Sequence, residues 1–168
     1  MLDASRPIEY DSTHQQWDTL FSSGKNDWET PQYLFDELDK EFHFTLDPCA
    51  EPHTAKCKKF YTRKDDGLKQ DWTGEVVFCN PPYSSHEQDL WVKKCYEHGR
   101  DGGVAVMLIP ARTDTNRFHD YILGKSEIRF LRGRVKFVGA KNCAPFPSMI
   151  VIFTEDTVNK HINFDYHY

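Results

Sequence analysis

Residues 104–109 (VAVMLI) form an unbroken apolar run, and this run constrains the fold more than any other feature of the chain. A strand with one face in water alternates apolar and polar residues, whereas a continuous apolar run is typical of a strand that is covered on both faces. A second buried strand is predicted over residues 76–79, and it must end there because Pro81 and Pro82 cannot continue a ladder. Strands of this kind are covered by helices, so the chain is predicted to adopt an α/β fold.

The remaining elements alternate between helix and strand. Thr30 is expected to cap a helix whose first position is Pro31. A second helix is expected over residues 87–99, with Leu90, Trp91 and Cys95 on its inner face. The other expected elements are strands at residues 44–47, 56–62, 127–131 and 149–153 and a helix at 115–123. This order predicts an open, mostly parallel sheet, in which ligands bind beyond the carboxyl ends of the strands.

The composition fits one soluble domain, with 168 residues of which 39% are hydrophobic and 28% charged. Residues 1–26 are expected to form a polar arm, residues 27–154 the folded domain and residues 155–168 a tail. The 26 Asp and Glu exceed the 21 Lys and Arg, which argues against non-specific coating of nucleic acid but permits an enzyme with a local basic face. The five cysteines are expected to be reduced, and the lack of a membrane-length apolar run or signal peptide predicts a cytoplasmic protein.

The segment Asn80-Pro81-Pro82-Tyr83 follows the strand at 76–79 directly. One interpretation is an ordinary turn, because consecutive prolines end a strand. The other is chemical: the prolines remove two backbone donors, so acceptors dominate the loop, while Asn80 adds a further acceptor and Tyr83 a flat ring. These groups suit an exocyclic amine on a planar base. Hydrogen bonds from both N–H groups would localise the nitrogen lone pair for attack on an electrophilic methyl group.

This motif resembles the (Asp/Asn)-Pro-Pro-(Tyr/Phe) signature of S-adenosylmethionine-dependent amino-methyltransferases. More particularly, the chain looks like the phage-type DNA N6-adenine methyltransferases, the phage Dam family. The similarity covers most of the chain and rests on the segments WETP 28–31, LDPCA 46–50, FYT 60–62, DGL 66–68, DW 71–72, NPPYS 80–84 and APFPS 144–148. It implies a compact, Rossmann-like methyltransferase sheet with helices on both faces. It also implies methyl transfer from S-adenosylmethionine to the N6 amine of adenine in double-stranded DNA, in the cytoplasm of a bacterial host.

By this resemblance the four motif residues are catalytic. Asn80 and the Pro81 carbonyl would hold the target amine, the Pro81-Pro82 step would keep the loop rigid, and Tyr83 would stack on the base. The base has to be turned out of the duplex, since its amine is otherwise paired. Transfer would be a direct displacement, so no catalytic histidine or cysteine and no metal is expected.

The resemblance also implies residues that bind the cofactor. Asp47, at a strand end, would attract a cationic amino-sulfonium ligand, although Asp-Pro is equally an ordinary turn start. Ala50 stands where many relatives have glycine and is small enough to admit a ligand. Thr30 and Pro31 would help bind the methionine carboxylate at a helix start, and Trp28 would wall off the same pocket.

Asp66 is the acid expected to accept a hydrogen bond from the cofactor adenine amine. It lies 14 residues before Asn80, a spacing similar to that in related enzymes. Asp65 and Asp71 compete for this role, and a solvated acidic loop over Lys64, Asp65 and Asp66 is an equally good account.

DNA contacts are expected from a cationic stretch between residues 112 and 141. Arg112, Arg132 and Arg134 are expected to bind substrate, and Phe146 is expected to be a second stacking partner for the base. The loop from residue 132 to residue 147 is the expected substrate loop. The full set of candidate phosphate ligands is Arg112, Arg117, Arg129, Arg132, Arg134, Lys136 and Lys141, and a solvated loop face is the alternative for each.

Three other functions stay open from the residues alone. The same loop serves enzymes that methylate RNA adenine or a protein glutamine amide, and an α/β module that binds nucleic acid without catalysis would need the prolines only as a turn. Cys49, His53 and Cys57 recur every four residues, but they lack a fourth zinc ligand and match no usual finger spacing. No obligate protein partner is apparent.

Overall fold

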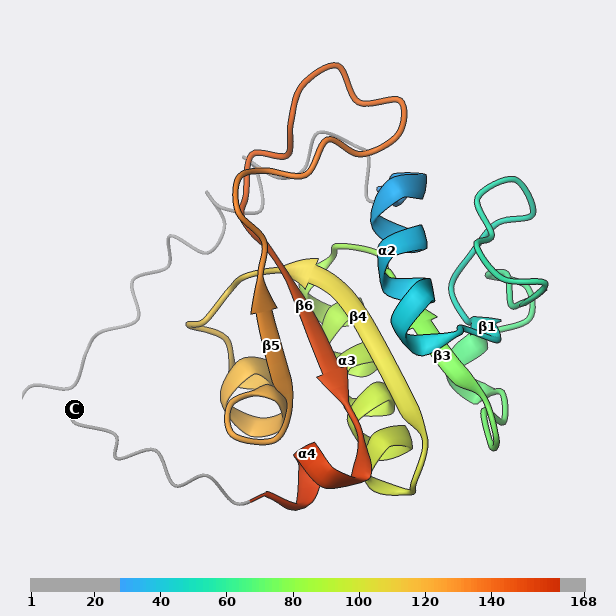
Figure 1. Ribbon diagram of the computed structural model, residues 1–168, viewed down its shortest axis with the longest axis vertical. Coiled ribbons are helices and arrows are strands. Elements are labelled where there is room, and N and C mark those ends of the chain that lie inside the picture. The colour runs from blue at the N-terminus through green and yellow to red at the C-terminus, as the bar shows by residue number, and fades with distance from the viewer. Residues whose placement is uncertain (1–27, 161–168) are drawn as a thin grey trace, which may run out of the picture.

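The computed structural model describes residues 28–160, so the expected arm at residues 1–26 lies outside the described part (Figure 1). The helices are α2 (Gln32–Phe42), α3 (Ser85–Arg100), α4 (Glu155–Asn159), the 3-10 turn η1 (Gly67–Lys69) and the π-helical turn η2 (Phe118–Ile122). The strands are β1 (Leu46–Asp47), β2 (Lys59–Phe60), β3 (Val76–Cys79), β4 (Val104–Pro110), β5 (Glu127–Phe130) and β6 (Ser148–Phe153). Within these described residues, no helix combines the length and the apolar character needed to span a membrane.

The strands form one six-stranded sheet in the order β2-β1-β3-β4-β6-β5. β1 pairs in parallel with β2 and with β3, and β3 pairs in parallel with β4. β6 runs antiparallel to both of its neighbours, β4 and β5. The sheet is therefore mixed, and the expectation of a mostly parallel sheet is wrong.

The direction of β6 follows from how the chain reaches it. Between β3 and β4 the chain passes through α3, and a crossover of this kind returns it in parallel. β5 and β6 are joined by residues 131–147, which contain no helix and bring the chain straight back. The apolar pattern of residues 149–153 shows that a strand is buried but carries no information on its direction.

Helices cover both faces of the sheet, as expected (Figure 1). Phe35 of α2 packs in the core on one face, and Cys95 of α3 packs in the core on the other. Neighbouring residues of β4 point to opposite faces, Val106 towards the core under α2 and Met107 towards the core under α3. This explains why the run at residues 104–109 contains no polar residue.

Three local expectations are corrected. Pro31, not Thr30, is the N-cap of α2, and no side chain caps this helix because the Thr30 hydroxyl is used elsewhere. Leu90 is exposed, since Trp91, Cys95 and other residues take the inner positions of α3. The segment expected as a helix over 115–123 forms the π-helical turn η2 instead.

The helix α4 begins the segment expected as a C-terminal tail, residues 155–168. A capping box between Thr154 and Thr157 starts it, with each side chain accepting a hydrogen bond from the backbone N–H of the other residue. Val158 is buried in the core under α3, so this first part of the segment packs onto the sheet.

Candidate active site

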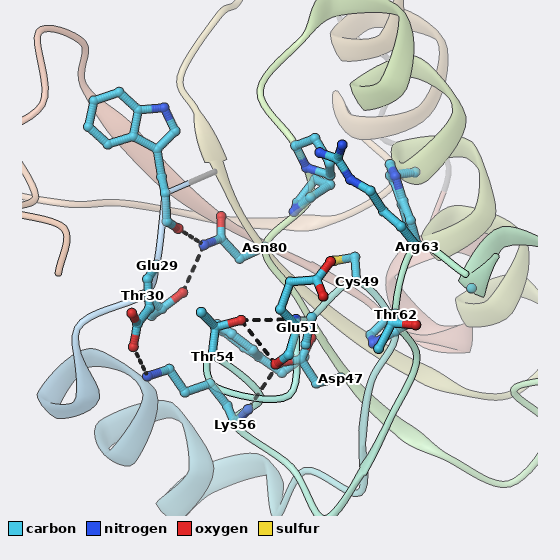
Figure 2. A pocket seen from close by; sticks show the side chains of 18 of the residues that line it. Glu29, Thr30, Asp47, Cys49, Glu51, Thr54, Lys56, Thr62, Arg63 and Asn80 are labelled. Carbon is cyan, nitrogen blue, oxygen red and sulfur yellow. Dashed lines mark hydrogen bonds and ion pairs between the residues drawn. The ribbon is translucent and has the colours of Figure 1, made fainter. Parts of the chain in front are cut away.

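A cavity of about 490 Å³ lies beyond the carboxyl ends of β1 and β3, beside the start of α2 (Figure 2). β1 ends at Asp47 and β3 at Cys79, so the loops that follow these adjacent strands face the same space. The expected site residues that line it are Trp28, Thr30, Asp47, Ala50, Asp66, Asn80, Pro81 and Pro82. The structure therefore brings together eight residues from four separate segments of the sequence. Pro31 and Tyr83 do not line the cavity.

The Asn80 side chain is oriented by two acceptors. Its Nδ2 donates to the backbone carbonyl of Trp28 and, over 2.9 Å, to Oγ1 of Thr30 (Figure 2). These two hydrogen bonds determine the orientation of the side-chain amide, because its nitrogen can donate a hydrogen bond and its oxygen cannot. Oδ1 of Asn80 is buried and has no hydrogen-bond partner among residues 28–160. A buried acceptor without a partner costs free energy, and this oxygen can accept a hydrogen bond from a donor placed beside it.

Tyr83 lies in an aromatic cluster next to the cavity. Its ring centroid is 5.4 Å from that of Phe146, 5.9 Å from that of Phe137 and 6.4 Å from that of Trp28. Burial raises the pKa of the Tyr83 phenol well above its ordinary value, and its hydroxyl donates to the Leu108 carbonyl. Phe146, the expected second stacking residue, is also buried. Neither ring is presented to the cavity.

Asp47 is a buried carboxylate at the end of β1. Its Oδ2 accepts the backbone N–H of Lys56 over 3.1 Å. Burial raises the pKa of Asp47 to about 6, although the hydrogen bonds from the Lys56 and Cys49 backbones and the charge of Lys56 lower it. A carboxylate kept out of water in this way interacts strongly with a cation placed beside it.

Lys56 is a cavity residue that sequence reasoning missed. Its side chain is only 8% exposed, and its Nζ lies 3.3 Å from Oε1 of Glu29 (Figure 2). The same Nζ lies 3.2 Å from Oε1 of Gln32. It thereby ties the loop after β1 to the residues around the start of α2. No local pattern signals this role, since Lys56 sits in a polar stretch without periodicity.

The structure separates the three competing acids. Asp66 lines the cavity and pairs with Lys69 over 2.7 Å at its rim. Asp65 accepts from the backbone N–H and the hydroxyl of Thr62, and Asp71 accepts from the same two groups of Thr73, so these two carboxylates hold their own turns. Neither of them lines the cavity.

The loop after β1 packs tightly against η1. A Cβ placed on Gly67 would lie 2.0 Å from the carbonyl oxygen of Pro48, so only glycine fits here. Cys49, on the same loop, has its sulfur 3.7 Å from that of Cys79, and burial raises the pKa of both thiols. All five cysteines are free, as expected.

The expected phosphate ligands differ in their exposure and in whether they are paired with a carboxylate. Arg132, Arg134, Lys136 and Lys141 are exposed on the loop between β5 and β6. Arg117 is buried and pairs with Asp89 over 2.8 Å, while both guanidinium nitrogens of Arg129 are held by Glu41. Arg112 is half-buried just after β4. The contact expected from Arg117 is thus contradicted, because its charge serves to fasten η2 to α3.

The three residues considered as zinc ligands, Cys49, His53 and Cys57, do not all lie at the cavity. Cys49 and His53 line the cavity, and Cys57 does not. Between residues 28 and 160, no three His, Cys, Asp or Glu side chains are placed so that they could hold a metal ion. The zinc alternative therefore gains no support.

Known proteins similar to this chain share one activity in their names. A model of the family DNA N-6-adenine-methyltransferase (Dam) matches residues 18–163. A DNA N-6-adenine-methyltransferase of Haemophilus phage HP1 (strain HP1c1) is 28% identical over 139 residues, which cover 78% of this chain and 80% of the relative. A protein of the same name from Escherichia phage T1 is 32% identical over 103 residues, covering 60% of this chain but only 42% of the relative. The putative methyltransferase YfdM of Escherichia coli (strain K12) is 35% identical over 63 residues, or 33% of this chain and 69% of the relative.

Proposed function

Because this chain belongs to the DNA N-6-adenine-methyltransferase (Dam) family, we propose that the cavity beside Asn80 is where it methylates adenine in DNA. The family match and the two phage relatives make it an adenine-specific DNA methyltransferase. The RNA, glutamine and non-enzymatic alternatives have no such support. What remains to be argued is which residues perform the reaction.

One observation carries the assignment of the catalytic residue. Oδ1 of Asn80 is a buried acceptor without a partner among the described residues, and the amide that bears it cannot turn without losing two hydrogen bonds. An adenine N6 amine placed in the cavity donates one N–H to this oxygen and the other to the Pro81 carbonyl. With both protons held, the nitrogen lone pair is directed away from the ring and becomes nucleophilic.

The adenine has to leave the duplex to reach these acceptors. Pro82 limits the motion of the loop that presents them, because its ring fixes the backbone. For Tyr83 to stack on the base, its ring has to be uncovered from Trp28, Phe137 and Phe146, with which it now packs. We therefore place base binding together with a movement within this aromatic cluster.

The residues of the cavity fit S-adenosylmethionine. Its volume of about 490 Å³ is that of a small-molecule site, and the buried acid Asp47 suits a ligand with a sulfonium and an ammonium group. Asp66 offers an acceptor at the opposite rim, Ala50 leaves room, and Thr30 and Trp28 close the side near α2. When bound, S-adenosylmethionine supplies a methyl group on a positively charged sulfur. Pro31 contributes only by starting α2, since it does not line the cavity.

The remaining features of the proposal concern the setting of the enzyme. The substrate is double-stranded DNA, gripped through Arg132 and Arg134, with Arg112 nearer the sheet. The work is done in the cytoplasm of a bacterial host without an obligate protein partner. The sheet is a Rossmann-like methyltransferase sheet in which β6 is the one reversed strand, a topology that the strand order supports.

The test is methyl transfer from labelled S-adenosylmethionine to duplex DNA by wild-type protein and by Asn80→Ala. The variant is expected to lose transfer by about 100-fold or more, as when one donor or acceptor of a preorganised site is removed, with cofactor affinity near the wild-type value. Asn159→Ala, at an exposed position of α4, is the matched control and should transfer normally. Equal loss of cofactor binding and transfer would show that Asn80 shapes the cofactor pocket instead. Label that enters RNA or protein but not DNA would contradict the substrate.

A further inference from the structure

We infer that Val138 is the side chain that enters the duplex when the adenine leaves it, with Lys136 and Lys141 on the phosphates at either side. This inference rests on the proposed function, because it assigns a residue to the base-flipping step of that reaction. Val138 is a partly exposed aliphatic residue at the rim of the cavity, and it belongs to the loop between β5 and β6, residues 131–147.

The loop 131–147 projects beyond the adjoining ends of β5 and β6 (Figure 1), and several of its side chains are buried. Val135, Phe137, Ala144 and Phe146 are buried in the core under α2. The N–H of Ala144 donates to the Val135 carbonyl over 2.8 Å, so the two arms of the loop are held together. Residues between them therefore form a tip of defined shape.

The tip is fastened to the catalytic residue through a short shared segment. The backbone N–H of Val138 donates to the Glu29 carbonyl over 3.0 Å, and Nδ2 of Asn80 donates to the carbonyl of the preceding residue, Trp28. The carbonyls of the consecutive residues Trp28 and Glu29 thus each accept a hydrogen bond, one from Asn80 of the motif and the other from Val138 of the loop. This places Val138 at a fixed position relative to the group that receives the adenine amine.

The tip of the loop carries an apolar side chain that can insert between base pairs, with a lysine on each side that can contact phosphates. Val138 is 48% exposed and lines the cavity, so part of its apolar side chain is available to a partner there. Gly139 follows with a φ of +73° and no side chain, which keeps the tip narrow. Lys136 and Lys141 flank it, are exposed, and form no ion pair within residues 28–160.

The other exposed large hydrophobic residues between residues 28 and 160 do not share this position. Tyr33, Leu90 and Phe130 lie on α2, α3 and β5, and none of them lines the cavity. A base that swings into the cavity leaves an unstacked gap in the duplex, and an apolar side chain that fills the gap recovers part of the lost stacking. Such a side chain has to reach the duplex from the mouth of the pocket that takes the base. Val138 meets this requirement.

The experiment compares Val138→Ala with wild type on two DNA duplexes. Both carry an adenine in a sequence at which methylation by the wild-type protein has been mapped, and in the second duplex an abasic site stands opposite that adenine. The abasic partner removes the base pair, so less work is needed to turn the adenine out. We expect kcat/KM of Val138→Ala to fall about tenfold on the paired duplex, a loss of roughly 1.4 kcal/mol, and to recover to near wild type on the abasic duplex.

Two control variants complete the design. Val138→Leu keeps an apolar side chain and should keep activity on both duplexes, and Leu90→Ala removes an exposed leucine far from the cavity lining and should have no effect. Equal activity of Val138→Ala and wild type on the paired duplex, or equal losses on both duplexes, would overturn this role of Val138. Wild-type protein that methylates DNA nowhere would overturn the proposed function and this inference with it.

Discussion

At the scale of single residues, the site depends on which atoms of Asn80 are already in use. Family signatures of this kind admit Asp or Asn at this position, but here Nδ2 donates to two oxygens, one of them the Trp28 carbonyl. A carboxylate could not donate to that carbonyl and would face it with like charge. The segment 28–30 therefore requires an amide at this position. Because the amide nitrogen donates to this segment, Oδ1 points away from it and is left without a partner among the described residues.

The pKa of Asp47 leads to a prediction on pH. Burial raises this pKa to about 6 from an ordinary value of 3.8, so the fold favours the protonated acid. The contribution of Asp47 to stability is therefore full below about pH 4 and is lost as pH rises through about 6. Asp47→Asn removes this loss, and we expect the free energy of unfolding at pH 8 to be unchanged or higher by up to about 3 kcal/mol.

Cofactor affinity should depend on pH in the opposite sense. The ionised carboxylate attracts the cationic ligand, so binding of S-adenosylmethionine to wild type should tighten between pH 5 and pH 7, whereas Asp47→Asn should bind weakly throughout. Titration calorimetry at several pH values, with urea unfolding of both proteins, measures the two effects. A variant that unfolds more easily at pH 8 would show that the charge stabilises the fold.

At the scale of elements, the cavity floor depends on the contact between η1 and the loop after β1. Gly67→Ala would place a Cβ 2.0 Å from a backbone oxygen of Pro48, which cannot move aside as a side chain can. We expect a loss of about 1–3 kcal/mol in unfolding free energy together with weaker cofactor binding. Gly103→Ala is the comparison, because the atoms nearest its Cβ belong to the His98 ring, which can move aside at the cost of its hydrogen bond to the Glu75 carbonyl, so a smaller loss is expected. Thermal and urea unfolding of both variants measure the difference, and equal losses would contradict it.

The elements also show what could be predicted from the sequence. β3, β4 and α3 were predicted within one or two residues, because their apolar patterns act over consecutive residues. The two-residue strands β1 and β2 lie inside longer predicted ranges, since only part of each range finds a pairing partner. Pairing direction and the π-helical turn depend on tertiary contacts that no short window contains.

The site shows the same division. Asp47 and Asn80 could be placed together because both follow strands whose carboxyl ends meet at one edge of a sheet. Lys56 and Val138 could not, because each reaches the cavity through the path of a loop. The burial of Arg117 could not be foreseen either, as its partner Asp89 lies on another element.

At the scale of the whole molecule, a chain of formal charge −5 has to bind a polyanion. Loop 131–147 carries four exposed cations and no acidic residue, whereas Arg117 and Arg129 are paired with carboxylates, so we expect the phosphates to contact this loop. Binding should therefore weaken with salt, with a slope set by the small number of phosphates that these cations neutralise.

Substitution of the loop arginines tests this charge distribution. The double variant Arg132→Ala/Arg134→Ala should weaken DNA binding for all sequences and reduce the slope of log K against log salt by about 0.9 for each phosphate that is no longer neutralised. Lys93→Ala on α3 also removes an exposed cation and should leave the slope unchanged. Fluorescence anisotropy at a series of salt concentrations measures both, and equal slopes for all three proteins would place the phosphate-binding residues elsewhere.

The position of β6 between β4 and β5 bears on how the protein is synthesised. When β4 leaves the ribosome it has β3 on one side only, and the backbone N–H and C=O groups of its other edge stay unpaired until residues 148–153 have also emerged. The strand made last is thus the one that closes the middle of the sheet. The sheet cannot be completed during translation before this strand emerges. Until then the nascent chain exposes an unpaired strand edge, which can pair with another chain and cause aggregation.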